Sequence, residues 1–167
     1  MEIVFFTANS QRSSSPVLAK LDSATVSGIM AIPVTIEVNT VPSSTDHFVN
    51  MVIVGLPDSS VKESHSRIEA ALSNSGLAQP AQRVTVNLAP ADIRKEGTGF
   101  DLPIAIGILA ANGQVDTVSL KRFMIVGELS LDGSLQPIRG ALPIAIEARK
   151  RGYEGLIVPQ QNAHEAA

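Results

Sequence analysis

The stretch of sequence that most limits the fold is the apolar run LPIAIGILAA, residues 102–111. A helix built from this run has no polar face, so it has to be buried on all sides. The run is about half as long as a membrane-spanning helix requires. It follows a charged segment and the turn Gly97-Thr98-Gly99. We therefore expect a core helix with Asp101 as its N-cap and Pro103 in its first turn.

Patterns typical of strands and helices surround this core helix. Two β-type runs, 34–41 and 47–57, are separated by the turn-forming cluster PSSTD, which predicts a hairpin. A helix is expected from Asp58, Ser59 or Ser60 to about Ser75, followed by a strand at 83–90. A hairpin is expected across Leu131-Asp132-Gly133. After it we expect a helix opened by Pro143 and closed by Gly152, a strand at 155–159, and a last helix beginning at Asn162 and Glu165. This order predicts one α+β domain, with helices packed on a mixed β-sheet.

The ends and the composition set the expected domain limits and compartment. Residues 1–16 end in a serine run and a proline, which predicts a disordered leader or a remnant of cloning, with the domain at 17–167. The chain has no cysteine, which excludes disulfides and thiolate metal sites. The N-terminal apolar stretch is too short for a signal peptide. We therefore expect a cytoplasmic protein with no membrane partner.

The common motifs for catalysis and metal binding are missing from the sequence. The turn Gly97-Thr98-Gly99 lacks the lysine of a phosphate-binding loop. His47, His65 and His164 are far apart, and His65 lies on the apolar face of the helix expected after Asp58, where a partly buried, hydrogen-bonded histidine is the simpler interpretation. The serines fall in the leader, in turns and at helix starts, which capping explains without catalysis. We expect no metal and no cofactor in this chain.

Basic residues provide the candidates for a DNA-binding or partner-binding surface. Arg149 to Arg151 lie in the last turn of a predicted helix, where the helix dipole favours cations without any ligand. Arg94 and Lys95 lie in a predicted loop, which has no dipole to explain them. With Arg139, these two residues are the predicted surface. The net charge of −3 and the absence of tryptophan argue against a general nucleic-acid-binding surface.

Four blocks of sequence together resemble one protein family. The blocks are VGLPDSSVKESHSRIEAALSNSG, VTVNLAPADIRKEGTGFDLPIAIGILAANG, VGELSLDGSLQPIRGALPIAIEA and GLIVPQQNAHEAA. They resemble the N-terminal domain of the magnesium-chelatase-like AAA+ ATPases, the YifB/ComM family, from about Val17 to the last residue. Residues 1–16 match nothing in that pattern, and TVPSSTDHF looks like a local variation. The resemblance implies an AAA+ module downstream, which this chain does not contain.

The same resemblance implies a fold like the proteolytic domain of Lon proteases, a ribosomal-protein-like βαβ fold. The position of the Lon nucleophilic serine falls on Gly99, and the position of the Lon lysine falls on Leu142. Glycine offers no nucleophile and leucine cannot accept a proton, so we expect no Ser-Lys dyad and no enzymatic activity in this chain. The glycine turn would then be retained as architecture or as a binding surface.

The function implied by the resemblance is that of a non-catalytic domain acting in ring assembly or DNA contact. The parent protein would be an ATPase, with ATP and magnesium bound in its AAA+ module, and would assemble as a hexamer during DNA branch migration, recombination or transformation. Two alternatives remain open from sequence. One is a peptidase with a displaced catalytic site, and the other is a domain of a chelatase-associated ATPase subunit.

Overall fold

The first two strands form a long antiparallel hairpin, of which the patterns above predict only the second strand. In this computed structural model, which describes residues 17–43, 50–77, 79 and 81–167, β1 (Val17–Ser27) pairs with β2 (Met30–Pro42). Gly28 has a φ of 61° in the tight turn between them, a conformation that favours glycine. The predicted leader, residues 1–16, lies outside the described residues.

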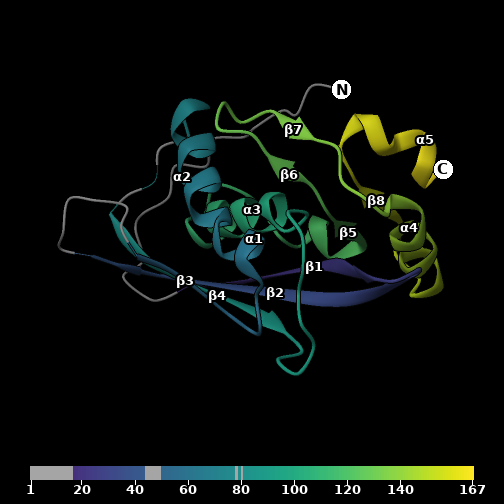
Figure 1. The fold of residues 1–167 in the computed structure, drawn as a ribbon. Helices are drawn as coiled ribbons and strands as arrows, with labels where there is room; N and C mark the ends of the chain where they lie inside the picture. Colours follow the sequence, from purple (N-terminus) through teal and green to yellow (C-terminus); the bar gives the residue numbers. More distant parts are fainter. Residues whose placement is uncertain (1–16, 44–49, 78, 80) are drawn as a thin grey trace.

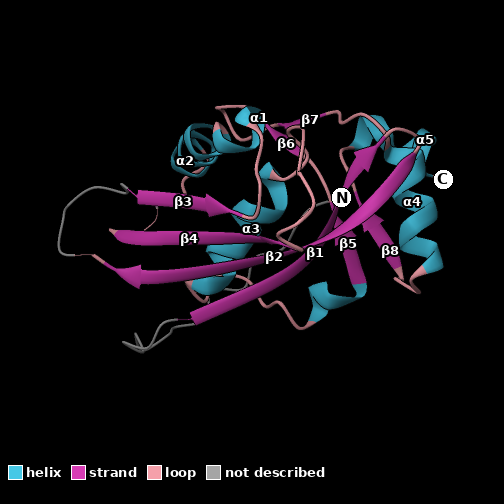
Figure 2. Cartoon of the chain, turned by 60° about the horizontal axis from the view of Figure 1, so that its bottom comes forward, coloured by secondary structure: helices cyan, strands magenta, loops and turns pink. Residues whose placement is uncertain are grey.

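Six strands form one mixed sheet in the order β3-β4-β2-β1-β5-β8. Pairing is antiparallel for β1 with β2 and for β2 with β4, and parallel for the other neighbours (Figure 2). The remaining strands are β3 (Asn50–Val54), β4 (Gln82–Ala89), β5 (Phe123–Ile125) and β8 (Gly155–Ile157). In β4, Val84, Val86 and Leu88 alternate into the core, as predicted.

The predicted hairpin between 34–41 and 47–57 is wrong. Strand β2 is paired with β1 on one side and with β4 on the other, so neither of its edges is free for β3. Strand β3 instead pairs in parallel with β4. Parallel neighbours require a crossover connection, and here α1 (Ser59–Lys62) and α2 (Ser64–Asn74) supply it.

The apolar run forms the central helix α3 (Asp101–Ala111), as predicted, and most of its residues are buried. Figure 1 shows α1, α2 and α3 on the same side of the β1–β4 part of the sheet. Helix α3 lies very close to β2, because a Cβ added at Gly107 would be 2.5 Å from Val38 Cγ2. The core of the domain therefore lies between this helix and the sheet.

The C-terminal third adds a small hairpin and a second crossover. Strands β6 (Glu128–Leu129) and β7 (Leu135–Gln136) pair antiparallel across the predicted Asp-Gly turn, which confirms that hairpin. Helix α4 connects the parallel strands β5 and β8 and packs on a second apolar cluster with β1. The other elements are η1 (Ser119–Arg122), α4 (Ala141–Lys150), η2 (Gln160–Asn162) and α5 (Ala163–Ala166). The architecture is a mixed sheet with packed helices, as expected for an α+β domain.

None of the helices in the described ranges has the length and apolar character needed to cross a lipid bilayer.

Candidate functional site

The glycine turn lies where three parts of the chain meet. Thr25 Oγ1, near the end of β1, is 3.3 Å from the Glu96 carbonyl oxygen, to which it donates. The amide of Gly127, after β5, donates to the Gly99 carbonyl at 2.9 Å. A Cβ added at Gly99 would be 3.8 Å from Ile138 Cγ2. The turn thus lies beside the loop that leads into α4, and the fold brings positions 99 and 138 together.

Asp101 does not cap α3 in the way that the sequence predicts. The N-cap position is Phe100, and Asp101 is the first residue of the helix, with a fully buried side chain. Its Oδ1 accepts from Ser64 Oγ at 2.5 Å and from Arg67 Nη2 at 3.0 Å. Its Oδ2 accepts from Arg67 Nε at 2.7 Å and from the Leu129 amide at 3.2 Å. The carboxylate therefore serves tertiary packing, because its acceptors face α2 and β6 rather than the backbone of its own helix.

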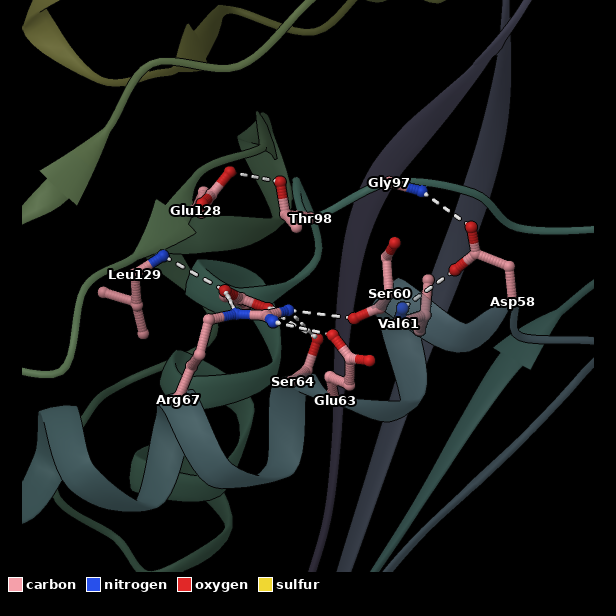
Figure 3. Close-up of polar contacts among 11 residues, drawn as sticks. Asp58, Ser60, Val61, Glu63, Ser64, Arg67, Gly97, Thr98, Glu128 and Leu129 are labelled. Carbon is pink, nitrogen blue, oxygen red and sulfur yellow. Dashed lines mark hydrogen bonds and ion pairs between the residues drawn. The ribbon is translucent and has the colours of Figure 1, made fainter.

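Arg67 is the main partner of this buried carboxylate, and Figure 3 shows its contacts. Its guanidinium also donates from Nη2 to the Ser60 carbonyl at 2.9 Å and lies 4.0 Å from the Glu63 carboxylate. The hydrogen bond with Asp101 raises the pKa of Arg67. The ion pair of the buried Asp101 carboxylate with the partly exposed Arg67 guanidinium connects α1, α2, α3 and β6 through charge-assisted hydrogen bonds. It leaves neither a free base nor a free acid at the start of α3.

Other polar groups beside the turn are also engaged. Asp58 caps α1, as predicted among the candidates, because its Oδ1 accepts from the Val61 amide at 2.8 Å. Its Oδ2 is 3.4 Å from the Gly97 amide nitrogen, which donates to it (Figure 3). Thr98 Oγ1 donates to the Glu128 carboxylate. These contacts fix the turn against α1 on one side and β6 on the other.

The three residues predicted as a binding surface have different environments. Arg94 is exposed over 70% of its side chain and pairs with Glu96 at 3.3 Å, and Arg139 is also exposed. Lys95 is fully buried, which contradicts a surface role. Its backbone pairs with Leu56 and Asp58, and Nζ donates to the Pro90 carbonyl oxygen. Burial lowers the pKa of Lys95. The backbone bridge to the segment after β3 explains why this loop lysine points inward.

The two positions that the resemblance aligns with a Ser-Lys dyad carry no such chemistry. Gly99 has no side chain, and Leu142 is an apolar residue with 49% exposure at the start of α4. The Leu142 amide donates to the Glu165 carboxylate at 3.2 Å. Among the described residues, no group of three or more His, Asp or Glu side chains could hold a metal ion. His65 Nε2 lies 3.6 Å from the Glu69 carboxylate, and His47 is outside the described residues.

Sequence reasoning missed two of the contacts that organise this region. Glu63 and Arg67 have the spacing of a surface ion pair, but the strong partner of Arg67 is Asp101, thirty-four residues away. Asn162 occupies the N-cap position of α5, as predicted, but its side chain makes no capping hydrogen bond. It accepts from the Ile138 amide at 2.9 Å and donates to the Ile138 carbonyl at 2.8 Å.

Comparisons with known proteins agree on one family. A family model described as "Subunit ChlI of Mg-chelatase" matches residues 36–162. The chain is 48% identical over 153 residues to the Competence protein ComM of Haemophilus influenzae, which covers 90% of this chain and 28% of that protein. It is 43% identical over 138 residues to the uncharacterized protein YifB of Escherichia coli, covering 83% of this chain and 26% of that protein. The chain thus spans about a quarter of the length of these relatives.

Proposed function

The chain belongs to the Mg-chelatase subunit ChlI family, with ComM and YifB as relatives, and we propose that it is a non-catalytic domain that acts by binding. Its principal role in this proposal is assembly of the larger protein, and DNA contact is the second candidate. The larger protein would be a cytoplasmic AAA+ ATPase that binds ATP and magnesium in another module. It would work as a ring in DNA recombination or transformation.

The proposal rests on one observation, which is that the polar side chains around the glycine turn already have hydrogen-bond partners within the chain. The Asp101 carboxylate accepts four hydrogen bonds in a fully buried position. A catalytic base needs a lone pair within reach of a substrate proton, and this carboxylate has no open approach. The turn and the Ile138 loop lie side by side. Position 99, however, offers no nucleophile.

The non-catalytic part of the proposal is tested with a serine-reactive fluorophosphonate probe and an unfolded protein substrate. We expect no labelling and no cleavage by the chain. As a matched control, Ser64→Ala removes the one buried serine hydroxyl that donates to Asp101. Labelling of the wild-type chain that Ser64→Ala abolishes would overturn the proposal and favour a peptidase with a displaced site.

DNA contact is supported by the exposed side chains of Arg94 and Arg139. Fluorescence anisotropy with forked, single-stranded and duplex DNA across a salt series tests it, because phosphate contacts weaken as salt rises. Salt-sensitive binding that Arg94→Ala and Arg139→Ala each weaken, with unchanged unfolding free energy, supports this second candidate. Absence of binding at low salt assigns the DNA work to another part of the larger protein.

A further inference from the structure

Exposed cations from two separate segments lie together where strands β5 and β8 begin. The two segments meet because the Glu154 amide, just before β8, donates to the Arg122 carbonyl at 2.9 Å and because Phe123 pairs with Gly155. Figure 2 shows β5 and β8 side by side, with α4 next to them. We call this surface the basic face, and its cations are Lys121, Arg122, Arg149, Lys150 and Arg151.

Part of the positive charge on the basic face is not neutralised within the chain. Arg122 pairs with Glu154 at 2.7 Å, and Arg151 pairs with Glu147 at 2.6 Å. Within the described ranges, the other three cations of the basic face form no ion pair. Lys121, Arg149 and Lys150 therefore keep their charge available for a ligand.

An exposed apolar side chain accompanies the cations of η1. Val118 immediately precedes η1 and is 69% exposed. Side chains three residues apart lie one above the other in a 3-10 helix, so Val118 and Lys121 share one side of η1. The Val118 amide donates to Asp116 Oδ1 at 2.9 Å, which holds the start of this segment in place.

Helix α4 has the same combination of apolar and basic side chains. Ile146 is 46% exposed, and Arg149 and Lys150 follow it by three and four residues, so the three lie on one side of the helix. Ile144 and Ala148, on the other side, are buried in the second apolar cluster. The helix thus packs on the domain with one side and presents apolar and basic groups with the other.

We propose that the basic face binds an acidic peptide segment of another protein. Carboxylates of the peptide pair with Lys121, Arg149 and Lys150, and its apolar side chains contact Val118 and Ile146. A single exposed ion pair contributes little, so several carboxylates and the apolar contacts act together. The inference rests on the proposed function as a domain that acts by binding, and it adds a partner other than DNA or a further copy.

A peptide fits the basic face better than a phosphate backbone does. Glu147 and Glu154 lie among the cations, with side-chain exposures of 20% and 56%, and they repel a continuous row of phosphates. A peptide can place an uncharged residue opposite each of them. Val118 and Ile146 gain apolar contact from peptide side chains, which a row of phosphates does not offer.

Fluorescence anisotropy with two labelled peptides tests the site on the whole chain. The first peptide consists of glutamate and aspartate with interspersed leucines, and in the second every leucine is replaced by serine at the same charge. We expect saturable binding of the leucine peptide and about tenfold weaker binding of the serine peptide. Equal affinity for both peptides, or no saturable binding of the leucine peptide, would overturn the proposal.

An apolar substitution locates the leucine contact on the chain. Ile146→Ser should weaken binding of the leucine peptide several-fold and leave binding of the serine peptide unchanged, because only the apolar contact is lost. A change of the same size for both peptides would contradict the assigned contact. Thermal unfolding of the variant checks that the fold is intact.

Charge reversal locates the carboxylate contacts. Arg149→Glu with Lys150→Glu should weaken binding of the leucine peptide by about tenfold or more, because like charges then face each other. The matched control Lys62→Glu with Arg83→Glu reverses two exposed cations of α1 and β4 and changes the net charge equally. It should alter the affinity by less than about twofold, since salt screens distant exposed charges. Equal losses for both pairs would contradict a local site.

Duplex DNA is the competitor in the last arm of the experiment. We expect the peptide to remain bound at DNA concentrations equal to its own. Tighter binding of duplex DNA than of the leucine peptide, abolished by the reversal at 149 and 150, would assign the basic face to a nucleic acid and overturn the proposal.

The two proposals fail in different ways. Labelling by the serine-reactive probe or substrate cleavage would defeat the non-catalytic function without affecting peptide binding. A chain with neither enzymatic activity nor peptide binding would lose the proposed peptide site, while the non-catalytic role would stand.

Discussion

At the scale of single residues, the stability of the region around the glycine turn depends most on one buried charge. The Asp101 side chain is fully buried, whereas that of Arg67, its one cationic partner among the residues that the structure describes, is 19% exposed. Removing the partner of a buried charge costs far more than the pair itself contributes. The single variants Arg67→Met and Asp101→Asn should therefore lose different amounts of unfolding free energy.

We expect Arg67→Met to lower the free energy of unfolding by about 3 to 5 kcal/mol, because it leaves the Asp101 carboxylate without its cation. Asp101→Asn should cost less, since Arg67 keeps some contact with water and with Glu63. The loss of unfolding free energy in the double variant should be smaller than the sum of the losses in the two single variants. Urea denaturation of the three variants measures this, and equal losses for the single variants would contradict the assignment.

Tyr153 provides a pH-dependent test at the same scale. Burial and the hydrogen bond with Asp22 raise the pKa of Tyr153 to about 12. Between the ordinary tyrosine pKa near 10 and this value, the folded chain keeps the proton that the unfolded chain has lost. The stability that Tyr153 contributes is therefore complete below pH about 10 and falls as the pH rises toward 12.

Comparing the wild type with Tyr153→Phe isolates this effect, because other groups titrate alike in both chains. The difference in unfolding free energy should be constant near neutral pH and should shift in favour of Tyr153→Phe at alkaline pH. A difference that does not change with pH would show that the hydroxyl is equally solvated in both states.

At the scale of elements, the packing of α3 on β2 depends on a glycine. An added methyl at position 107 would be 2.5 Å from Val38 Cγ2, too close for the present spacing. We expect Gly107→Ala to lower stability by about 1 to 3 kcal/mol through overpacking, although alanine alone favours a helix by about 1 kcal/mol. Thermal unfolding measures the change. Combination with Val38→Ala should recover part of the loss, and strict additivity of the two would contradict the close contact.

The amide side chain of Asn162 connects the C-terminal segment to the loop before α4 by hydrogen bonds. Asn162 is buried and satisfies both backbone groups of Ile138. Asn162→Ala should cost about 1 to 3 kcal/mol, because these groups lose their partner. Hydrogen exchange at the Ile138 amide should accelerate in the same variant. The control Gln161→Ala alters the exposed residue next to Asn162 and should change stability by less than about 0.5 kcal/mol.

Local sequence patterns correctly predicted the elements that depend mainly on residues close together in the sequence. The unbroken apolar run predicted a buried α3, alternation predicted the inward face of β4, and the Asp-Gly turn predicted the β6–β7 hairpin. The predicted pairing partner of β3 was wrong, because a turn-rich segment between two strands does not determine whether those two strands pair with each other. The roles of Asp101 and Lys95 were also wrong, since residues distant in sequence determine both.

At the scale of the whole molecule, exposed basic side chains from η1 and from the end of α4 lie close together, because the Glu154 amide donates to the Arg122 carbonyl. In the proposed function this chain acts by binding, and association with further copies is its principal role. Assembly is therefore the activity that the account predicts for the domain by itself.

Sedimentation velocity of the wild-type chain at low and high salt tests that claim most directly. The account predicts oligomers that grow with protein concentration at low salt and dissociate toward monomers as salt screens the charged side chains between copies. A chain that sediments as a monomer at both salt concentrations, at every protein concentration tested, would contradict it.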